Sequence, residues 1–519
     1  MAEVLRVKRL FTGGSVLTSA YSEPTDWLLV EEGTVVGSGK KDDAPRADEV
    51  FEMDGACLIP AFRDAHVHLP ATGLYATGLD FRGEKSAGAI LDAFRGKAAS
   101  DPASILFGGN FEDPLSHPLL ARDLDDAVGD RPALLARADM HSCIVSSGLL
   151  EELPLDGIEG VDRGEDGRPT GYLREQAAAE AWTWFDRNLT PQQQTDAVLA
   201  AVRLAYSKGV AEVHEMFVVE WRGWAAAEVF SDAVRDVALD VAMWLGTDEV
   251  DRVVELGMPR IGGDYFLDGS FGSHTAWLGE PYRSPAPGGS SPTGISYRDP
   301  EALLELFKAA QRADLQMGVH AIGDAAIEQA IGTWEKMAAE VGADEVRRKG
   351  HRIEHFECAS DDHIRRAVDL GLRASVQPAF DLYWGGQDKL YSERIGWDRA
   401  QLMNRFKSMR DAGLMLAAGS DSTVTPLDPF LQMQALRDHH VPAQRLSAAD
   451  ALDLHTAGPA AIAGHSGLKG TLRPGMQADL AILDKSPLDT SPGSLQGTQV
   501  LGTWIAGSRV WPEADAEVE

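Results

Sequence analysis

Residues 56–70, "ACLIPAFRDAHVHLP", decide how the chain is interpreted. An apolar run leads into His66 and His68, and Asp64 stands just before them. Side chains two residues apart lie on the same face of an extended strand, so both imidazoles can approach one ion. Polar residues are also common at the ends of ordinary strands. The pair alone therefore leaves a metal site and a polar strand end as two open interpretations.

The middle of the chain alternates between apolar runs and alanine-rich helical runs such as "TDAVLAAVRLAYSKG" and "EALLELFKAAQRADL". Strands that alternate with helices of this length predict βα units around a parallel sheet. Nine further runs are candidate strands: "ILFGGN", "ALLARADMH", "VAEVHEM", "VAMWLG", "DYFLDGS", "LQMGVHAIG", "HRIEHFE", "LRASVQP" and "LMLAAGSD". Their number is close to that of a (β/α)8 TIM-like barrel, with allowance for insertions.

The two ends of the chain have a different texture. Short apolar runs there are broken by Gly and Pro, as in "RLFTGGSVLT" and "GMQADLAILDKSP", a pattern typical of a β-meander. We therefore expect an α/β protein in which residues 1–60 and 466–519 form one small β-sandwich domain. Residues 61–465 are expected to form the barrel.

The composition is that of a folded globular protein, with 44% hydrophobic and 25% charged residues. The formal net charge of −32 would repel phosphate backbones and anionic membranes, so neither nucleic acid nor a membrane is an expected partner. The three cysteines are widely separated, which fits a reduced cytoplasm, and no run has the length of a membrane span. The oligomeric state is open, and a homodimer is the commonest arrangement.

Three more polar residues occupy the position that follows a candidate strand. His320 ends "LQMGVH", His355 ends "HRIEH", and Asp421 ends "LMLAAGSD". In a (β/α)8 barrel the catalytic groups gather where strands end and loops begin. Together with His66 and His68 they form a nitrogen and oxygen donor set suited to zinc or another first-row divalent ion. Such an ion lowers the pKa of bound water towards ~7 and makes it a nucleophile.

The chain resembles the amidohydrolase superfamily, specifically amidohydrolase family 3, the YtcJ-like metal-dependent hydrolases. The resemblance runs from about residue 5 to residue 515. It rests on the segments "LIPAFRDAHVHLP", "HAIGDAAI", "RIEHFE", "AAGSDSTVTPLDPF" and "HTAGPAAIAGHSGLKGTLRPGMQADLAILDKSP". It implies that the metal ligands are His66, His68, His320, His355 and Asp421. Asp421 would also take a proton from the attacking water.

The same resemblance suggests residues that bind the substrate. Asp268 lies in "LDGSFGSHTAWL", Glu175 in "LREQA" and His141 in "ADMHSCIVSSGLL", and each of these segments matches a family segment. His274 and Trp277 are further candidates from the loop after Asp268. Each of the five residues is also compatible with a purely structural role.

The chain departs from the family at Asp264. Many relatives carry a lysine four residues before the "DGS" aspartate, carboxylated so that it bridges two metal ions, whereas this chain has Asp264. Asp264 and Asp268 are expected on the same side of an extended strand, so Asp264 could be a ligand or bridge, or a solvated acid at the strand edge. The alternative is a single ion held by His66, His68, His320 and Asp421. His355 would then polarise the substrate. The sequence favours one zinc over two.

The function predicted from these observations is hydrolysis of a non-peptide C–N bond, an amide or N-acyl group, in a small molecule. Asp421 would be the base and His355 would stabilise the oxyanion. One alternative is hydrolytic deamination of an amino-heterocycle, with Glu215 as the additional acid. Another is a barrel that has lost catalysis and serves as a scaffold, and intact metal ligands argue against it.

Overall fold

The computed structural model describes residues 7–101, 105–112, 114–137, 142–284, 291–488, 495 and 497–512. These residues form two compact units. Unit 1 comprises Met1–His68, Arg203–Val218 and Val237–Glu519, and unit 2 comprises Leu69–Val202 and Val219–Asp236. The division does not test the predicted boundaries after residues 60 and 465, which stay predictions. Among the described residues, no helix is both long and apolar enough to cross a membrane.

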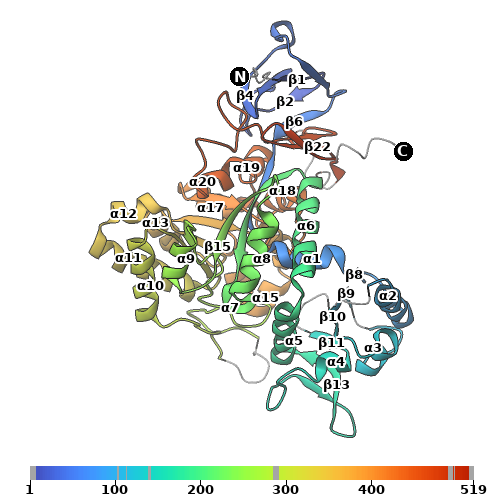
Figure 1. The fold of residues 1–519 in the computed structure, drawn as a ribbon. Helices are drawn as coiled ribbons and strands as arrows, with labels where there is room; N and C mark the ends of the chain where they lie inside the picture. Colours follow the sequence, from blue (N-terminus) through green and yellow to red (C-terminus); the bar gives the residue numbers. More distant parts are fainter. Residues whose placement is uncertain are drawn as a thin grey trace. The chain divides into compact units, whose positions relative to one another are not determined.

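The centre of unit 1 consists of parallel strands followed by helices (Figure 1). The strands form two sheets, with the orders β15-β14-β7 and β16-β17-β18-β19-β20, and every pairing in them is parallel. Their bounds are β7 (Phe62–Val67), β14 (Val210–Phe217), β15 (Asp240–Leu245), β16 (Arg260–Ile261), β17 (Gln316–Ala321), β18 (Arg352–His355), β19 (Arg373–Val376) and β20 (Met415–Ala418). Unit 1 is thus an α/β structure.

Backbone hydrogen bonds join the two parallel sheets at both of their ends. The N–H of Gly262, just after β16, donates to the carbonyl of Leu245 in β15 at 2.8 Å. At the other side, Asp421, just after β20, donates to the carbonyl of His66 in β7 at 2.8 Å. The first and the last of these parallel strands, β7 and β20, therefore lie beside each other, and both end at the same edge.

The helices of unit 1 have polar caps at several of their starts. Asp299 accepts from two N–H groups at the start of α10, and Ser360 caps α13, which satisfies donors that have no partner within the helix. The helices are α9 (Val250–Glu255), α10 (Pro300–Arg312), α11 (Asp324–Val341), α12 (Ala343–Lys349), α13 (Asp361–Asp369), α14 (Pro378–Trp384), α15 (Leu390–Ile395), α16 (Trp397–Ala400), α17 (Phe406–Asp411), α18 (Pro429–Arg437), α19 (Ala448–Asp453) and α20 (Ala457–Ile462).

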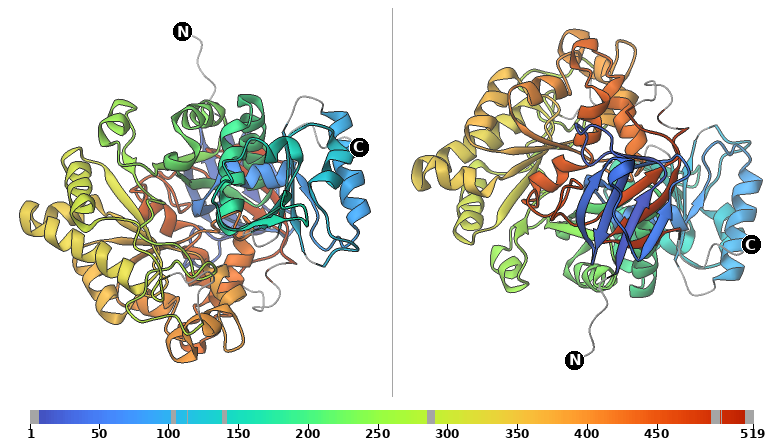
Figure 2. Two further views of the ribbon diagram at one scale, coloured as in Figure 1. Left: turned by 90° about the horizontal axis from the view of Figure 1, so that it is seen from below. Right: turned by 90° about the horizontal axis from the view of Figure 1, so that it is seen from above.

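Both chain ends contribute strands to unit 1, and strands from the two ends pair with each other. One sheet has the order β4-β3-β1-β5 and the other β2-β6-β21-β22-β23, where N-terminal and C-terminal strands pair directly (Figure 2, right). Phe11, Leu28, Leu58, Leu480 and Trp504 are buried in one apolar cluster that draws on both sheets. The strands are β1 (Lys8–Thr12), β2 (Ser15–Val16), β3 (Trp27–Glu31), β4 (Thr34–Gly39), β5 (Glu49–Glu52), β6 (Cys57–Pro60), β21 (Leu480–Leu483), β22 (Val500–Ile505) and β23 (Ser508–Trp511).

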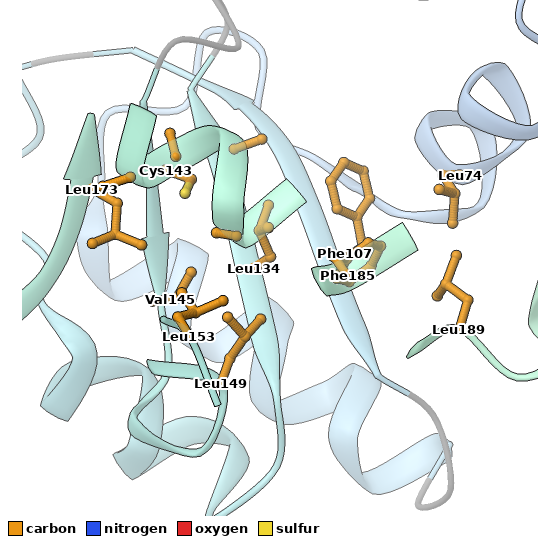
Figure 3. Close-up of a cluster of buried hydrophobic side chains, with 14 of the residues drawn as sticks. Leu74, Phe107, Leu134, Cys143, Val145, Leu149, Leu153, Leu173, Phe185 and Leu189 are labelled. Atoms are coloured by element: carbon orange, nitrogen blue, oxygen red, sulfur yellow. The ribbon is translucent and has the colours of Figure 1, made fainter. Parts of the chain in front are cut away.

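Unit 2 has a sheet and an apolar core of its own (Figure 3). Its strand order is β12-β13-β11-β10-β9-β8, with bounds β8 (Leu79–Asp80), β9 (Leu106–Phe111), β10 (Ala133–Arg137), β11 (Ser142–Val145), β12 (Val161–Arg163) and β13 (Pro169–Arg174). The helices of this region are α1 (Leu69–Thr77), α2 (Ala87–Ser100), α3 (Ala121–Val128), α4 (Ser147–Leu150), α5 (Glu175–Asn188), α6 (Pro191–Ser207), α7 (Val219–Arg222) and α8 (Trp224–Val234). Leu134, Val145 and Phe185 are buried in its core.

Three of the nine candidate strands differ from the expectation. The runs "ILFGGN" and "ALLARADMH" correspond to β9 and β10, which belong to the sheet of unit 2 and not to the parallel sheets of unit 1. The run "DYFLDGS" is not a regular strand, because Gly262 and Gly263 before it have φ of 82° and 73° and end the extended conformation after Ile261. Asp264 therefore lies in a bend rather than in a strand.

Candidate metal centre and active site

Six of the predicted site residues gather where the parallel strands of unit 1 end. They are His66 in β7, His68 just after it, Asp264 after β16, His320 in β17, His355 at the end of β18 and Asp421 after β20. The imidazoles of His66 and His355 have ring centroids 4.9 Å apart, and those of His320 and His355 are 4.3 Å apart. Side chains from strands far apart in sequence thus meet at one edge, as the barrel hypothesis requires.

Asp264 lies at the centre of this group, and its two oxygens face different histidines. Oδ2 is 3.3 Å from Nε2 of His66 and 3.1 Å from Nε2 of His68. Oδ1 is 3.5 Å from Nδ1 of His320 and 3.6 Å from Nε2 of His355. The side chain is 3% exposed. Asp264 is therefore not a solvated acid at a strand edge, and it divides the four histidines into two pairs.

Asp421 completes the first of these pairs. Its Oδ1 is 3.5 Å from Nε2 of His66 and 3.2 Å from Nε2 of His68. The ligand atoms of His66, His68 and Asp421 lie within 4.8 Å of one another, as do those of His66, Asp264 and His355. The donors therefore form two overlapping groups that meet at His66.

Each histidine has an inner ring nitrogen, which faces one or both of the carboxylates of Asp264 and Asp421, and an outer ring nitrogen, which points away from them. The outer nitrogen of each histidine lies against an oxygen that accepts hydrogen bonds. The four contacts are His66 Nδ1 with Glu354 Oε2 at 2.9 Å, His68 Nδ1 with the Met216 carbonyl at 3.0 Å, His320 Nε2 with the Gly269 carbonyl at 3.2 Å, and His355 Nδ1 with Gln377 Oε1 at 2.7 Å. Because each of these oxygens accepts, the outer nitrogens carry the protons. The inner nitrogens then present lone pairs to the carboxylates.

The inner atoms have no hydrogen-bond partners within the described part of the chain. Buried and without partner are His66 Nε2, Asp264 Oδ1, His320 Nδ1, His355 Nε2 and Asp421 Oδ1. Lone pairs of nitrogen and oxygen facing one another at this depth are unfavourable unless a cation lies between them. Imidazole and carboxylate donors arranged in this way fit a divalent metal ion.

The charges in the site favour a cation in the same place. Burial alone would raise the pKa of Asp421 and lower that of His66 and His68. The facing opposite groups outweigh burial, so the pKa of Asp421 is lowered, that of His66 is raised, and that of His68 is raised to about 10. The two carboxylates therefore draw positive charge into the space between the rings.

Two of these residues have unusual backbone conformations. His355 has a φ of 70° and Asp421 a φ of 51°, both in the left-handed region that residues with a Cβ rarely adopt. Each such residue costs on the order of 1–3 kcal/mol and persists where the surrounding structure demands it. The fold thus holds both side chains at the strand ends against a local preference.

Similarity to known proteins identifies the family of this chain. A family model described as the amidohydrolase family matches residues 49–511. The chain belongs to the amidohydrolase family. This amidohydrolase is thus a hydrolase that acts on carbon–nitrogen bonds other than peptide bonds, and the family resemblance of its sequence is confirmed.

Several relatives of this amidohydrolase match along almost the whole chain. The YtcJ protein of Bacillus subtilis is 26% identical, over 98% of this chain and 100% of its own length. An N-substituted formamide deformylase of Arthrobacter pascens is 25% identical, over 92% of this chain and 94% of its own. The crystal structure of a metal-dependent hydrolase from Pyrococcus furiosus is 27% identical, with a TM-score of 0.77, and covers 93% of this chain and 100% of its own.

Among the predicted substrate-binding residues of the amidohydrolase, Asp268 has structural contacts. Its Oδ1 accepts from the N–H of Ile322, and its Oδ2 accepts from those of Gly323 and Trp277, all at 2.8–3.0 Å. Asp268 Oδ1 is also 3.8 Å from Nε2 of His320. Asp268 therefore fixes the loop after β17 beside the histidines, and a direct contact with substrate stays a prediction. The segment from Asp264 to Asp268 is not the regular strand that was expected, yet both carboxylates lie near His320.

The other predicted substrate-binding residues are less fully placed. His274 is buried with its Nε2 3.1 Å from Oγ of Ser284, and Trp277 is half-buried. Glu175 begins α5 in unit 2, but its side chain lies outside the described part of the structure. His141 lies outside the described residues altogether. Their contacts with substrate stay predictions.

Sequence reasoning missed two residues that hold the histidines. Glu354 and Gln377 accept from the outer nitrogens of His66 and His355. Glu354 directly precedes His355 in β18, where Ile353 is the only apolar residue, so an apolar pattern could not single it out. Gln377 follows β19 directly, in the position where strand-end residues were sought.

A second group of possible ligands gathers around Asp381. Both His439 and His440 contact Oδ1 of this buried carboxylate. However, His439 is already engaged at both nitrogens, because its Nε2 lies 2.9 Å from the carbonyl of Asn404 and its Nδ1 accepts from the N–H of Val441 at 3.0 Å. These contacts explain the group as a hydrogen-bond network, and we assign no ion to it.

Proposed function

We propose that this chain is a metal-dependent hydrolase that cleaves an amide or N-acyl C–N bond of a small molecule. The observation that carries the proposal is the set of five buried inner atoms that have no hydrogen-bond partner among the described residues, while the histidines among them are held by their outer nitrogens. These lone pairs would face one another unfavourably unless metal ions or protons lay between them, and metal ions can engage all of them at once. This argues against a scaffold that has lost catalysis.

The choice of an N-acyl bond has separate support. The relative from Arthrobacter pascens is named an N-substituted formamide deformylase, and it matches over nearly the full length of both chains. We extend that chemistry to this chain as a class only, because fold and family do not determine the substrate.

The proposed scaffold is a (β/α)8 barrel with a small β-sandwich domain from residues 1–60 and 466–519. The hydrogen bonds from Gly262 to Leu245 and from Asp421 to His66 support closure of the two parallel sheets into one ring. The apolar cluster that includes Phe11, Leu58 and Trp504 supports packing of the two end sheets face to face.

We propose zinc as the ion, and two ions rather than the one that the sequence favours. One would be held by His66, His68 and Asp421, and the other by His320 and His355. Asp264 would contribute one oxygen to each, since Oδ2 faces the first pair of histidines and Oδ1 the second. A carboxylate with two divergent oxygens can then serve where many relatives use a carboxylated lysine.

The residues of the chain have distinct roles in this proposal. When bound, the metal would lower the pKa of water towards ~7 and polarise the substrate carbonyl. Oδ1 of Asp421 faces His66 and His68. Oδ2 would then take a proton from the attacking water and return it to the leaving nitrogen. His355, held by Gln377 through Nδ1, would keep its Nε2 directed at the second ion and would help to stabilise the oxyanion through that ion. Asp268 keeps the adjacent loop in place.

The deaminase alternative is less well supported. It needs an acid to protonate a ring nitrogen, and Glu215 was the candidate. Glu212 and His214 lie on the face of β14 that contacts other buried residues of the parallel sheets, such as Arg63 and Arg352. Regular strand alternation would place Glu215 on the opposite face. We therefore place N-acyl hydrolysis before deamination.

A substrate panel tests the proposal. We expect purified, zinc-loaded protein to release amine from N-formyl or N-acetyl amines, and to lose that activity by at least about 100-fold after chelator treatment, because the metal supplies the nucleophile. Adding zinc back should restore it. Ammonia release from amino-heterocycles, without activity on N-acyl amines, would favour the deaminase instead.

A further inference from the structure

One of the four outer contacts of the histidines differs in kind from the others. His68, His320 and His355 each face a neutral oxygen, whereas His66 faces the carboxylate of Glu354. Both His66 and Glu354 are fully buried, at 0% exposure. A buried carboxylate is costly unless it is paired, so its partners indicate what it is for.

Glu354 is held by the fully buried Arg352 through two hydrogen bonds. Nε of Arg352 donates to Oε1 at 2.5 Å, and an NH2 hydrogen is donated to Oε2 at 2.7 Å. The same guanidinium donates to the carbonyl of Ala65 at 2.7 Å and lies 3.1 Å from Nδ1 of His214. Arg352 therefore binds both the carboxylate and the strand that carries His66, which fixes Glu354 relative to that histidine.

We infer that Glu354 is a positioning residue for the metal centre. It accepts the proton of His66 Nδ1, holds the tautomer in which Nε2 carries the lone pair, and aims that lone pair between Asp264 and Asp421. Its Oε2 is shared between Arg352 and His66, so the carboxylate does more than neutralise the arginine. The inference rests on the proposed function in one respect, namely that His66 binds an ion.

A matched pair of buried carboxylates separates positioning from stability. Asp479 is 2% exposed and pairs with buried Arg63 at 2.7 Å, but its described contacts include none of the proposed ligands. Glu354→Gln and Asp479→Asn each remove one buried charge with little change of shape. Both should lose stability. Only Glu354→Gln should affect the metal.

The experiment measures zinc retention by the full chain in competition with a chromophoric chelator, together with thermal unfolding of the metal-free protein. We expect zinc affinity to fall by about 10–100-fold in Glu354→Gln and by less than about twofold in Asp479→Asn. Cobalt-loaded Glu354→Gln should also show an altered visible spectrum. Equal zinc affinity in the two variants and the wild type would overturn the inference, and a wild type that binds no zinc would instead refute the proposed function.

A second variant covers the case in which Glu354→Gln does not fold. Arg352→Lys keeps a positive charge beside Glu354 but loses the two-pronged contact that orients it. We expect zinc affinity several-fold below wild type in this variant. Wild-type affinity in folded Arg352→Lys would count against Glu354 as a positioning residue.

Discussion

Replacing Asp421 by asparagine is expected to lower kcat/KM for N-acyl hydrolysis by ~10³-fold or more, since general acid–base catalysis alone contributes about 10²–10⁴-fold. Asparagine keeps the shape of the side chain. It cannot take the proton from water, and it removes one of the two carboxylate charges that face His66 and His68. The measurement is steady-state kinetics on zinc-loaded protein, with metal content determined on the same samples.

Asp479→Asn is the control for this prediction, because it removes a buried carboxylate in unit 1 that contacts none of the proposed ligands within the described residues. It should keep kcat/KM within a few-fold of wild type at a temperature where it is folded. An Asp421→Asn enzyme that retains more than about a tenth of wild-type activity would exclude Asp421 as the base, since a lost base costs at least about 100-fold.

Replacing Asp264 by asparagine is expected to reduce the metal content from about two ions per chain to about one, because a bridging ligand contributes to both positions of a two-metal site. Asparagine retains a single carbonyl oxygen, so it can serve only one pair of histidines. Elemental mass spectrometry after dialysis measures the change.

Asp268→Asn is the matched control for Asp264→Asn. It changes a buried aspartate four residues further along the chain. The oxygens of Asp268 accept hydrogen bonds from backbone N–H groups and do not lie between the two pairs of histidines. This variant should keep about two ions per chain. Two ions retained in Asp264→Asn would contradict the bridging role and leave Asp264 as a neighbouring charge.

Strand-end positions made much of the site predictable from the sequence. His66, His68, His320, His355 and Asp421 each follow or end an apolar run, and parallel strands bring such residues to one edge. The order of the strands along the chain was sufficient to place them together, without knowledge of any side-chain angle.

The remaining features depend on contacts between distant residues. Asp264 was expected in a strand with Asp268, but the positive φ angles of Gly262 and Gly263 turn the chain and bring Asp264 between the histidine pairs. Similarly, β9 and β10 have the same apolar pattern as the other strands, yet they build the sheet of unit 2. Periodicity identifies a strand, but it does not say which sheet the strand joins.

Anomalous diffraction from crystals of the zinc-loaded protein, recorded on both sides of the zinc absorption edge, tests the central claim most directly. We predict two zinc peaks, one beside His66, His68 and Asp421 and the other beside His320 and His355, with Asp264 between them. A single peak would contradict the two-ion site and restore the one-metal alternative. Absence of any peak at these residues in fully zinc-loaded crystals would contradict metal-dependent hydrolysis at this site.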